Sequence, residues 1–104
     1  MSDPRPTATL VYNDLTAIGA LRALVELGVR VPSDMAVVGT DGIEFGRYTS
    51  PTLTTVDHPR AELGRRGVET LCRLLNGEVA SDTECWLEPN LIVRESCGAV
   101  AIRG

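Results

Sequence analysis

Three short apolar segments of this chain each stop abruptly at polar residues, and this repeated pattern restricts the possible folds more than any other feature. Residues 36–39 run into Thr40, Asp41 and Gly42, residues 8–12 into Asn13 and Asp14, and residues 53–56 into Asp57 and His58. Short apolar runs rich in β-branched residues are typical of buried strands. Ligands of open α/β sheets bind beyond the carboxyl ends of the strands, so the three polar clusters predict one binding site.

A helix is predicted between the first two strands, because apolar residues there recur at steps of three and four. They are Leu15, Ile18, Leu21, Leu24 and Val25. Asn13 or Asp14 can cap the first turn by accepting from its free N–H groups, and Gly28 stands where a left-handed C-terminal cap belongs. Residues 29–34 then connect to a strand at residues 35–39. This is a βαβ unit, whose strands should be parallel with a right-handed crossover.

A second helix is predicted to begin around Pro59, where the missing N–H of proline does no harm, and to end at Asn76 and Gly77. Two glycines on its inward face would let a packing partner approach closely. That face comprises Leu63, Gly64, Gly67, Val68, Leu71, Cys72 and Leu75. The pattern therefore predicts a helix that is buried along one side.

The remaining segments complete an α/β domain with a mostly parallel sheet. Residues 40–51 are predicted to form a loop or an irregular turn, and residues 85–93 a strand that Pro89 interrupts, as at an edge or a bulge. Residues 1–7 and 95–104 carry little structural signal. A chain of 104 residues is long enough for one small domain.

Composition and charge exclude several classes of protein. The apolar runs are too short to span a bilayer, and the N-terminal residues lack the order of a signal peptide, so we expect a cytoplasmic protein without membrane contact. Ten arginines, scattered except for the adjacent Arg65 and Arg66, with no lysine and a net charge of −4, do not form a nucleic-acid footprint. Cys72, Cys85 and Cys97 are expected to be reduced thiols, with Cys72 in the core and Cys97 in the tail, and no metal site is expected.

Each candidate site residue also has a simpler structural interpretation. Asn13 and Asp14 could only cap a helix, Asp41 could form a turn, and His58 could be a solvated residue at a helix start. Their convergence on one edge of the sheet favours ligand binding, because three unrelated caps need not share an edge. Two of the chain's three phenylalanine and tyrosine residues, Phe45 and Tyr48, share a loop, where they could cover the crevice, fill the local core or anchor a partner chain.

Enzyme motifs are absent from the sequence. There is no GxGxxG, P-loop or GxSxG segment, and the single histidine has no nearby cysteine or serine partner. A phospho-receiver domain would share the doubly wound plan, but that family relies on a lysine, which this chain lacks. We therefore expect binding without catalysis or a cofactor.

The ordered motifs of the chain resemble the C-terminal part of LacI/GalR-family transcriptional regulators. The similarity covers about residues 9–98. It is carried by residues 10–14 (LVYND), 19–24 (GALRAL), 31–34 (VPSD), 37–41 (VVGTD), 50–56 (SPTLTTV), 63–64 (LG) and 93–96 (VRES). The resemblance implies part of a periplasmic-binding-protein-like type I core, which closes on a sugar or another small metabolite.

The resemblance also implies roles for particular residues. Asn13, Asp41 and His58 match positions that contact the effector, whereas Ile18 and the loop containing Phe45, Tyr48 and Thr49 match surfaces that pair the subunits of a dimer. Gly42 and His58 depart from the residues common in the family, which leaves the effector's identity open.

We therefore expect residues 1–104, ordered over about 8–98, to be a C-terminal effector-binding and dimerisation fragment. Its partners would be a small-molecule effector and a second copy, with exchanged elements as one form of the homodimer, and operator DNA only through a missing N-terminal helix-turn-helix. The alternative is a fragment of a periplasmic or extracellular sugar-binding protein.

Overall fold

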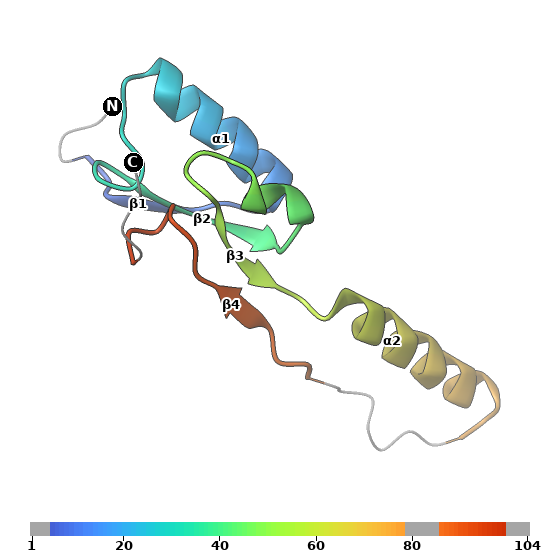
Figure 1. The fold of residues 1–104 in the computed structure, drawn as a ribbon. Helices are drawn as coiled ribbons and strands as arrows, with labels where there is room; N and C mark the ends of the chain where they lie inside the picture. The colour runs from blue at the N-terminus through green and yellow to red at the C-terminus, as the bar shows by residue number, and fades with distance from the viewer. Residues whose placement is uncertain (1–4, 79–85, 100–104) are drawn as a thin grey trace. The chain divides into compact units, whose positions relative to one another are not determined.

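The computed structural model describes residues 5–78 and 86–99, and it contains an α/β unit followed by a second helix (Figure 1). The α-helices and strands, in chain order, are β1 (Ala8–Leu10), α1 (Asp14–Glu26), β2 (Ala36–Asp41), β3 (Thr54–Asp57), α2 (Arg60–Leu75) and β4 (Asn90–Ile92). A short 3-10 helix, η1 (Glu44–Arg47), lies in the loop between β2 and β3. The chain divides into two compact units, residues 1–57 with 90–104, and residues 58–89.

The first unit is built on a four-stranded sheet in the order β1-β2-β3-β4. β1, β2 and β3 are parallel, and β4 pairs with β3 in the antiparallel direction. The predicted α/β class with a mostly parallel sheet is confirmed, and so is the parallel pairing of the first two strands. The predicted strand at residues 85–93 was too long: of its described residues, 86–93, only Asn90–Ile92 pairs with β3, directly after Pro89, which has no N–H to donate.

The core of this unit lies between α1 and one face of the sheet. Its buried residues are Ala17, Leu21, Leu24, Val29, Met35, Val37 and Leu53. The helical spacing correctly placed Leu21 and Leu24, but Leu15 and Val25 are mostly exposed and Ala17 is fully buried. An inward-facing alanine is hard to recognise from periodicity, because alanine is only weakly apolar and is also common on helix surfaces. Gly28 has φ +73°, as expected for the residue that ends a helix in the left-handed conformation.

The segment after β4 holds the amino-terminal ends of β2 and β3 together. Ser96 is fully buried; its Oγ accepts from the Thr54 N–H at 2.8 Å, and its carbonyl accepts from the Val37 N–H at 2.9 Å. Glu95 accepts from both the N–H and the hydroxyl of Thr52, at 3.0 Å each. Ser96, in a segment with little sequence signal, is therefore a buried residue that connects β2 and β3.

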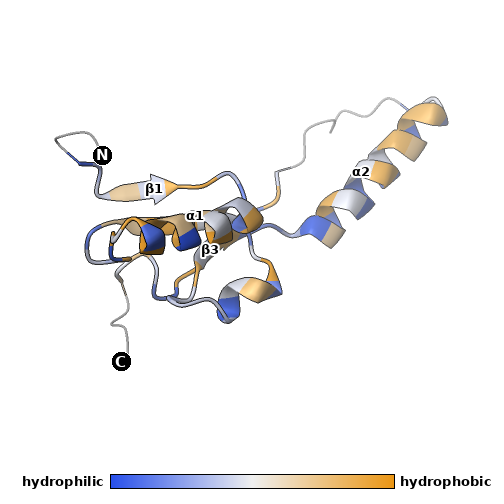
Figure 2. Cartoon of the chain, turned by 90° about the horizontal axis from the view of Figure 1, so that it is seen from above, coloured by the Kyte–Doolittle hydropathy of each residue, from blue (hydrophilic) through white to orange (hydrophobic). Residues whose placement is uncertain are grey.

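The second unit contains α2. The prediction that one face of this helix is buried was wrong. None of its described residues is buried: Leu63 is 54% and Leu71 55% exposed, and Cys72 is exposed rather than in the core. A Cβ added at Gly64 or Gly67 would meet nothing within 4 Å. Figure 2 shows apolar and polar residues along the same helix. A unit of this length is too short to bury a helix face by itself, so the amphipathic pattern forms the helix without burying it.

Charged side chains support α2 on its surface. Arg65 pairs with Glu62 and, at 2.6 Å, with Glu69, while Arg66 pairs with Glu62 at 2.8 Å. These partners are three or four residues apart, which is the spacing that brings side chains together on a helix. Among the described residues, no helix is both long and apolar enough to cross a membrane.

Candidate functional site

Parallel pairing brings the carboxyl ends of β1, β2 and β3 to one edge of the sheet. Leu10 pairs with Val38, and further along β2 the residue Asp41 pairs with Asp57 of β3. The Thr40 hydroxyl donates to the Val11 carbonyl at 3.3 Å, which ties the end of β2 to the chain that leaves β1. The polar residues of the first unit at these strand ends, Asn13, Asp14, Asp41 and Asp57, therefore share one edge of its sheet.

Asn13 is the N-terminal cap of α1. It has an extended backbone, and its Oδ1 accepts from the Thr16 N–H at 2.8 Å. This confirms the structural interpretation of Asn13 as a cap. The side chain is only partly buried, and its Nδ2 group keeps two donors that the cap does not use. Capping and ligand contact are therefore compatible at this residue.

Asp41 ends β2 in an unusual backbone conformation. Its φ is 116°, and Asp41 is the only non-glycine residue with a positive φ in residues 5–78 and 86–99. Such a conformation costs energy and persists only where the surroundings enforce it, and such residues gather at functional sites. The side chain is partly buried. Asp41 is therefore a fixed feature of this edge rather than a residue of a relaxed turn.

Asp14, the first residue of α1, is the buried centre of the edge. It is 0% exposed. Its Oδ1 accepts from the Thr55 hydroxyl at 2.7 Å, and its Oδ2 accepts from the Ile43 N–H at 2.9 Å. The amino-terminal end of a helix also favours a carboxylate. A buried carboxylate needs such partners, because an unpaired one would cost several kcal/mol.

Thr55 connects this carboxylate to the loop after β2. Its hydroxyl donates to Asp14 and accepts from the Gly42 N–H at 3.1 Å. Both hydrogen-bonding roles of the hydroxyl are thereby used. The N–H groups of Gly42 and Ile43, which directly follow the strained Asp41, are bound by Thr55 and Asp14 respectively.

Two glycines leave room for these acidic side chains. A Cβ at Gly39 would lie 2.2 Å from Oδ1 of Asp14, and a Cβ at Gly42 would lie 2.6 Å from Oδ1 of Asp57. Gly42 has φ +72°, which glycine adopts readily. Asp57 is partly buried against this glycine. Glycine at position 42 thus makes space for Asp57.

His58, the third predicted ligand contact, follows Asp57 and begins the second unit. Its side chain is partly buried. The structure brings Asn13 and Asp41 to a common edge, whereas His58 is described only within its own unit. Within the described ranges, no group of three or more His, Cys, Asp or Glu residues is arranged to hold a metal ion.

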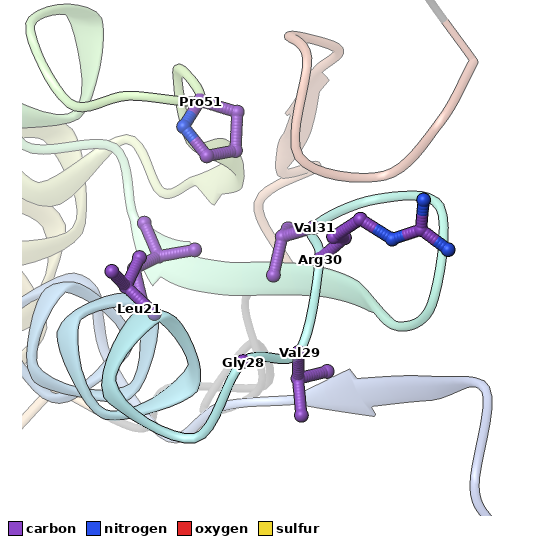
Figure 3. Close-up of a pocket in the computed structure, with 7 residues that line it drawn as sticks. Leu21, Gly28, Val29, Arg30, Val31 and Pro51 are labelled. Carbon is purple, nitrogen blue, oxygen red and sulfur yellow. The ribbon is translucent and has the colours of Figure 1, made fainter.

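Two of the predicted dimer residues line one surface hollow of about 230 Å³. Its lining residues are Ile18, Leu21, Arg22, Val25, Thr49 and Ser50. A neighbouring apolar hollow of 320 Å³ shares Leu21 and Val25 and extends to Pro51 (Figure 3). Figure 3 shows the Arg30 guanidinium extending away from Leu21 and Pro51. The carboxyl half of α1 therefore offers an apolar surface next to Thr49.

Phe45 and Tyr48 lie in and just after η1. They are 71% and 75% exposed, so neither fills the local core as one interpretation of the sequence had it. They remain available for the other two roles, covering a crevice or contacting a partner chain. Exposed aromatic side chains of this size are common anchors at protein interfaces.

Sequence reasoning missed the residues that hold the site together. The sequence predicted Asp14 as an alternative cap and as part of the polar cluster after the first strand, and Thr55 only as a strand residue. An acid directly after a capping asparagine was the available sequence signal for Asp14. No local pattern indicates the Asp14–Thr55 pair, since the two residues are 41 positions apart.

Comparison with known proteins extends the similarity over almost the whole chain. A family model described as a periplasmic binding protein-like domain matches residues 1–97. The ribose operon repressor of Haemophilus influenzae is 41% identical over 92 residues, which cover 88% of this chain and 28% of the repressor. The chain thus spans less than a third of the length of this curated relative.

Solved structures give the same picture. A LacI family transcriptional regulator from Arthrobacter sp. FB24, in complex with lactose, is 41% identical with a TM-score of 0.74, over 91% of this chain and 36% of the other. The lac repressor dimer bound to operator and the anti-inducer ONPF is 39% identical with a TM-score of 0.78, over 88% of this chain and 28% of the other.

Proposed function

This chain belongs to the periplasmic binding protein-like domain family, in the LacI/GalR group of transcriptional regulators, and from this premise we propose that residues 1–104 form a C-terminal part of the regulator's effector-binding and dimerisation core. The DNA-binding helix-turn-helix would lie elsewhere in a longer protein. The similar curated protein is named as a repressor, and we assign the chain no catalytic role.

The proposed effector is a sugar or another small hydroxyl-rich metabolite. An amide such as that of Asn13 can both donate and accept, the carboxylate of Asp41 can accept two hydroxyl protons, and a neutral imidazole at His58 can do one of each. These groups suit a polyol, whose hydroxyls also donate and accept. Lactose is bound in one solved relative, which supports this class of effector.

One observation carries this proposal: the parallel strands deliver Asn13 and Asp41 to the same edge of the sheet, with Asp41 in a conformation that the surroundings must enforce. In open α/β sheets this edge is where ligands bind. His58 is proposed as a third contact because it directly follows β3, the next strand of the parallel set.

We further propose that the surface formed by Ile18, Phe45, Tyr48 and Thr49 pairs two copies of the regulator. The apolar hollow beside Ile18 and Thr49, and the exposed rings of Phe45 and Tyr48, give this surface the composition of an interface. A two-fold dimer would use the same patch on both copies.

The test is titration calorimetry of the intact regulator with a panel of mono- and disaccharides that includes lactose and D-ribose. We expect one of them to bind, Asp41→Ala to lose most of the affinity, and Asp41→Asn to show how much of that loss is due to charge. Asp34→Ala is the matched control. It also removes an acidic side chain, but one that precedes the amino-terminal end of β2, and this variant should bind the sugar normally. Normal affinity in Asp41→Ala would remove Asp41 from the site.

The alternative of a periplasmic or extracellular sugar-binding protein is less well supported, because the similar proteins named above are transcriptional regulators. A regulator would act in the cytoplasm, where its operator lies. Reading the gene upstream of Met1 separates the two: a helix-turn-helix supports the regulator, whereas a signal peptide would support the exported protein.

A further inference from the structure

We propose that Asp14 is a positioning residue for the effector site: together with Thr55 it holds the loop after β2 so that Asp41 is presented in one fixed conformation. This inference rests on the proposed function for its purpose, but not for its structural basis. Asp14 is fully buried, so it acts through its neighbours and not by touching a ligand.

The contacts explain how the loop is held. Asp41 has φ 116°, and the two amides that follow it are both bound by groups outside the loop. The Gly42 N–H donates to the Thr55 hydroxyl at 3.1 Å, and the Ile43 N–H donates to Asp14 Oδ2 at 2.9 Å. The strained residue is therefore followed by two fixed peptide groups, which limit the conformations that its own backbone can adopt.

The carboxylate is itself fixed from three sides. It belongs to the first turn of α1, its Oδ1 accepts from Thr55 of β3, and Gly39 of β2 allows its close approach to the sheet. A shift of Asp14 would thus disturb a helix and two strands, which makes it a rigid support. Binding sites gain affinity when their polar groups are fixed before the ligand arrives, because less freedom is lost on binding.

The first measurement needs no ligand. Hydrogen exchange of the Gly42 and Ile43 amides is followed in the full chain for wild type, Asp14→Asn, Thr55→Val and Thr55→Ser. We expect exchange at both amides to rise roughly tenfold in Asp14→Asn and Thr55→Val. Thr55→Val removes the acceptor of the Gly42 N–H, Asp14→Asn leaves one acceptor oxygen for the two donors Thr55 and Ile43, and the Asp14–Thr55 hydrogen bond couples the two amides. Thr55→Ser keeps the hydroxyl and should restore slow exchange. If Asp14→Asn does not fold, the Val and Ser pair at position 55 decides.

Thr54→Val provides the matched control. Thr54 is 1% exposed, adjacent to Thr55, and its hydroxyl accepts from the Arg94 N–H at 2.9 Å, away from the loop. It should destabilise the chain without selectively raising exchange at Gly42 and Ile43. Unchanged exchange at those amides in Thr55→Val, or an equal rise across the whole sheet in every variant, would overturn the proposal.

The second measurement is the affinity of the intact regulator for whichever of lactose and D-ribose the wild type binds. Thr55→Val should weaken it roughly tenfold, whereas Thr55→Ser and Thr54→Val should stay within about twofold. Faster loop exchange with unchanged affinity would overturn the positioning role. If the wild type binds neither these two sugars nor any other member of the saccharide panel, the proposal of a sugar effector fails, and exchange alone judges whether Asp14 and Thr55 hold the loop.

Discussion

The Asp14 carboxylate accepts a hydrogen bond from the Thr55 hydroxyl at 2.7 Å, and both residues are completely buried. This contact joins the start of α1 to the middle of β3. It lies beneath the loop that follows Asp41. The polar edge of the sheet therefore packs on buried polar side chains rather than on apolar ones. Such an arrangement is sensitive to small changes in volume, because its hydrogen bonds tolerate little displacement.

Gly39→Ala tests how tightly this interior is packed. The added Cβ would lie 2.2 Å from Asp14 Oδ1 and 3.2 Å from Leu53 Cδ2, so the carboxylate would have to move. We expect a loss of about 1–3 kcal/mol in the free energy of unfolding, typical of overpacking. Urea denaturation measures it.

Gly19→Ala is the control for that change. Gly19 lies within α1, and a Cβ there would meet nothing within 4 Å. Alanine at such a position should stabilise the helix by about 0.5–1 kcal/mol. Equal effects of the two substitutions would show that the Gly39 contact is not tightly packed.

Ser96→Ala tests the segment that closes the other end of the sheet. The Ser96 hydroxyl accepts from the Thr54 N–H and donates to the Val37 carbonyl, and the residue is fully buried. Its removal leaves a buried N–H without this partner, at a cost of about 1–3 kcal/mol. The exposed Ser33→Ala should change stability by less than about 0.5 kcal/mol. Thermal unfolding of both variants checks this, and an unaffected Ser96→Ala would mean that water replaces the hydroxyl.

The features of the fold that sequence could predict are those set by neighbouring residues. The strand–helix–strand order of residues 8–41 and the terminating Gly28 depend on local spacing and were correctly predicted. The strand bounds were not, because β1 ends at Leu10 rather than at Tyr12 and β2 continues to Asp41, where a loop was predicted from residue 40. Burial of Cys72 and Leu63 was not, because an apolar helix face is buried only if another element covers it. Ser96 was missed because its partner Val37 lies 59 residues away.

The same distinction between local and long-range determinants applies to the candidate site. The positions of Asn13 and Asp41 after two parallel strands follow from element order alone. The positive φ of Asp41 does not, and neither do the hydrogen bonds that bind the next two amides, because their acceptors Asp14 and Thr55 lie elsewhere in the sequence. Sequence therefore indicated the edge and the polar groups on it, but not the residues beneath that fix them.

The stability of the turn before β2 should decrease at acidic pH. The Arg30 side chain donates to Asp34, and the Arg30 backbone N–H donates as well; both hydrogen bonds hold the pKa of the Asp34 carboxyl below its ordinary value. Because the folded-state pKa of Asp34 is lowered, the ionised Arg30–Asp34 pair stabilises the turn at pH values above the ordinary pKa of a carboxyl group. This stabilisation is lost as the pH falls through the lowered pKa, below about pH 4.

Arg30→Gln should therefore raise the pKa of Asp34 towards its ordinary value, which an NMR titration of its carboxyl carbon measures. The backbone N–H of Arg30 would still donate, so the return should be incomplete. Arg22→Gln removes a comparable exposed pair with Glu26 and should leave Asp34 unchanged. An unaltered titration in Arg30→Gln would mean that the backbone contact alone lowers the pKa.

Ile18→Arg tests the proposed dimer surface. Ile18 lines the hollow that also contains Thr49, and a charged side chain buried there against its own copy would be unpaired. We expect the intact regulator to shift towards monomer in sedimentation velocity. Leu15→Arg makes the same change at an exposed position of α1 outside that hollow and should leave the assembly intact. If both variants sediment like wild type, another surface holds the copies together.

The last prediction separates the residues of a site from a complete site. The chain spans 28% of the ribose operon repressor, and ligand sites of this size bury most of a small ligand between facing walls. A sugar resting only on the edge that carries Asn13 and Asp41 would keep most of its hydroxyls in water, where each new hydrogen bond replaces one with water and gains about 1 kcal/mol or less. We therefore expect residues 1–104 alone to bind lactose and D-ribose weakly or not at all, even if the intact regulator binds one of them tightly. Calorimetry on both proteins with the same sugars makes the comparison, and comparable affinity in the short chain would place the whole site within these 104 residues.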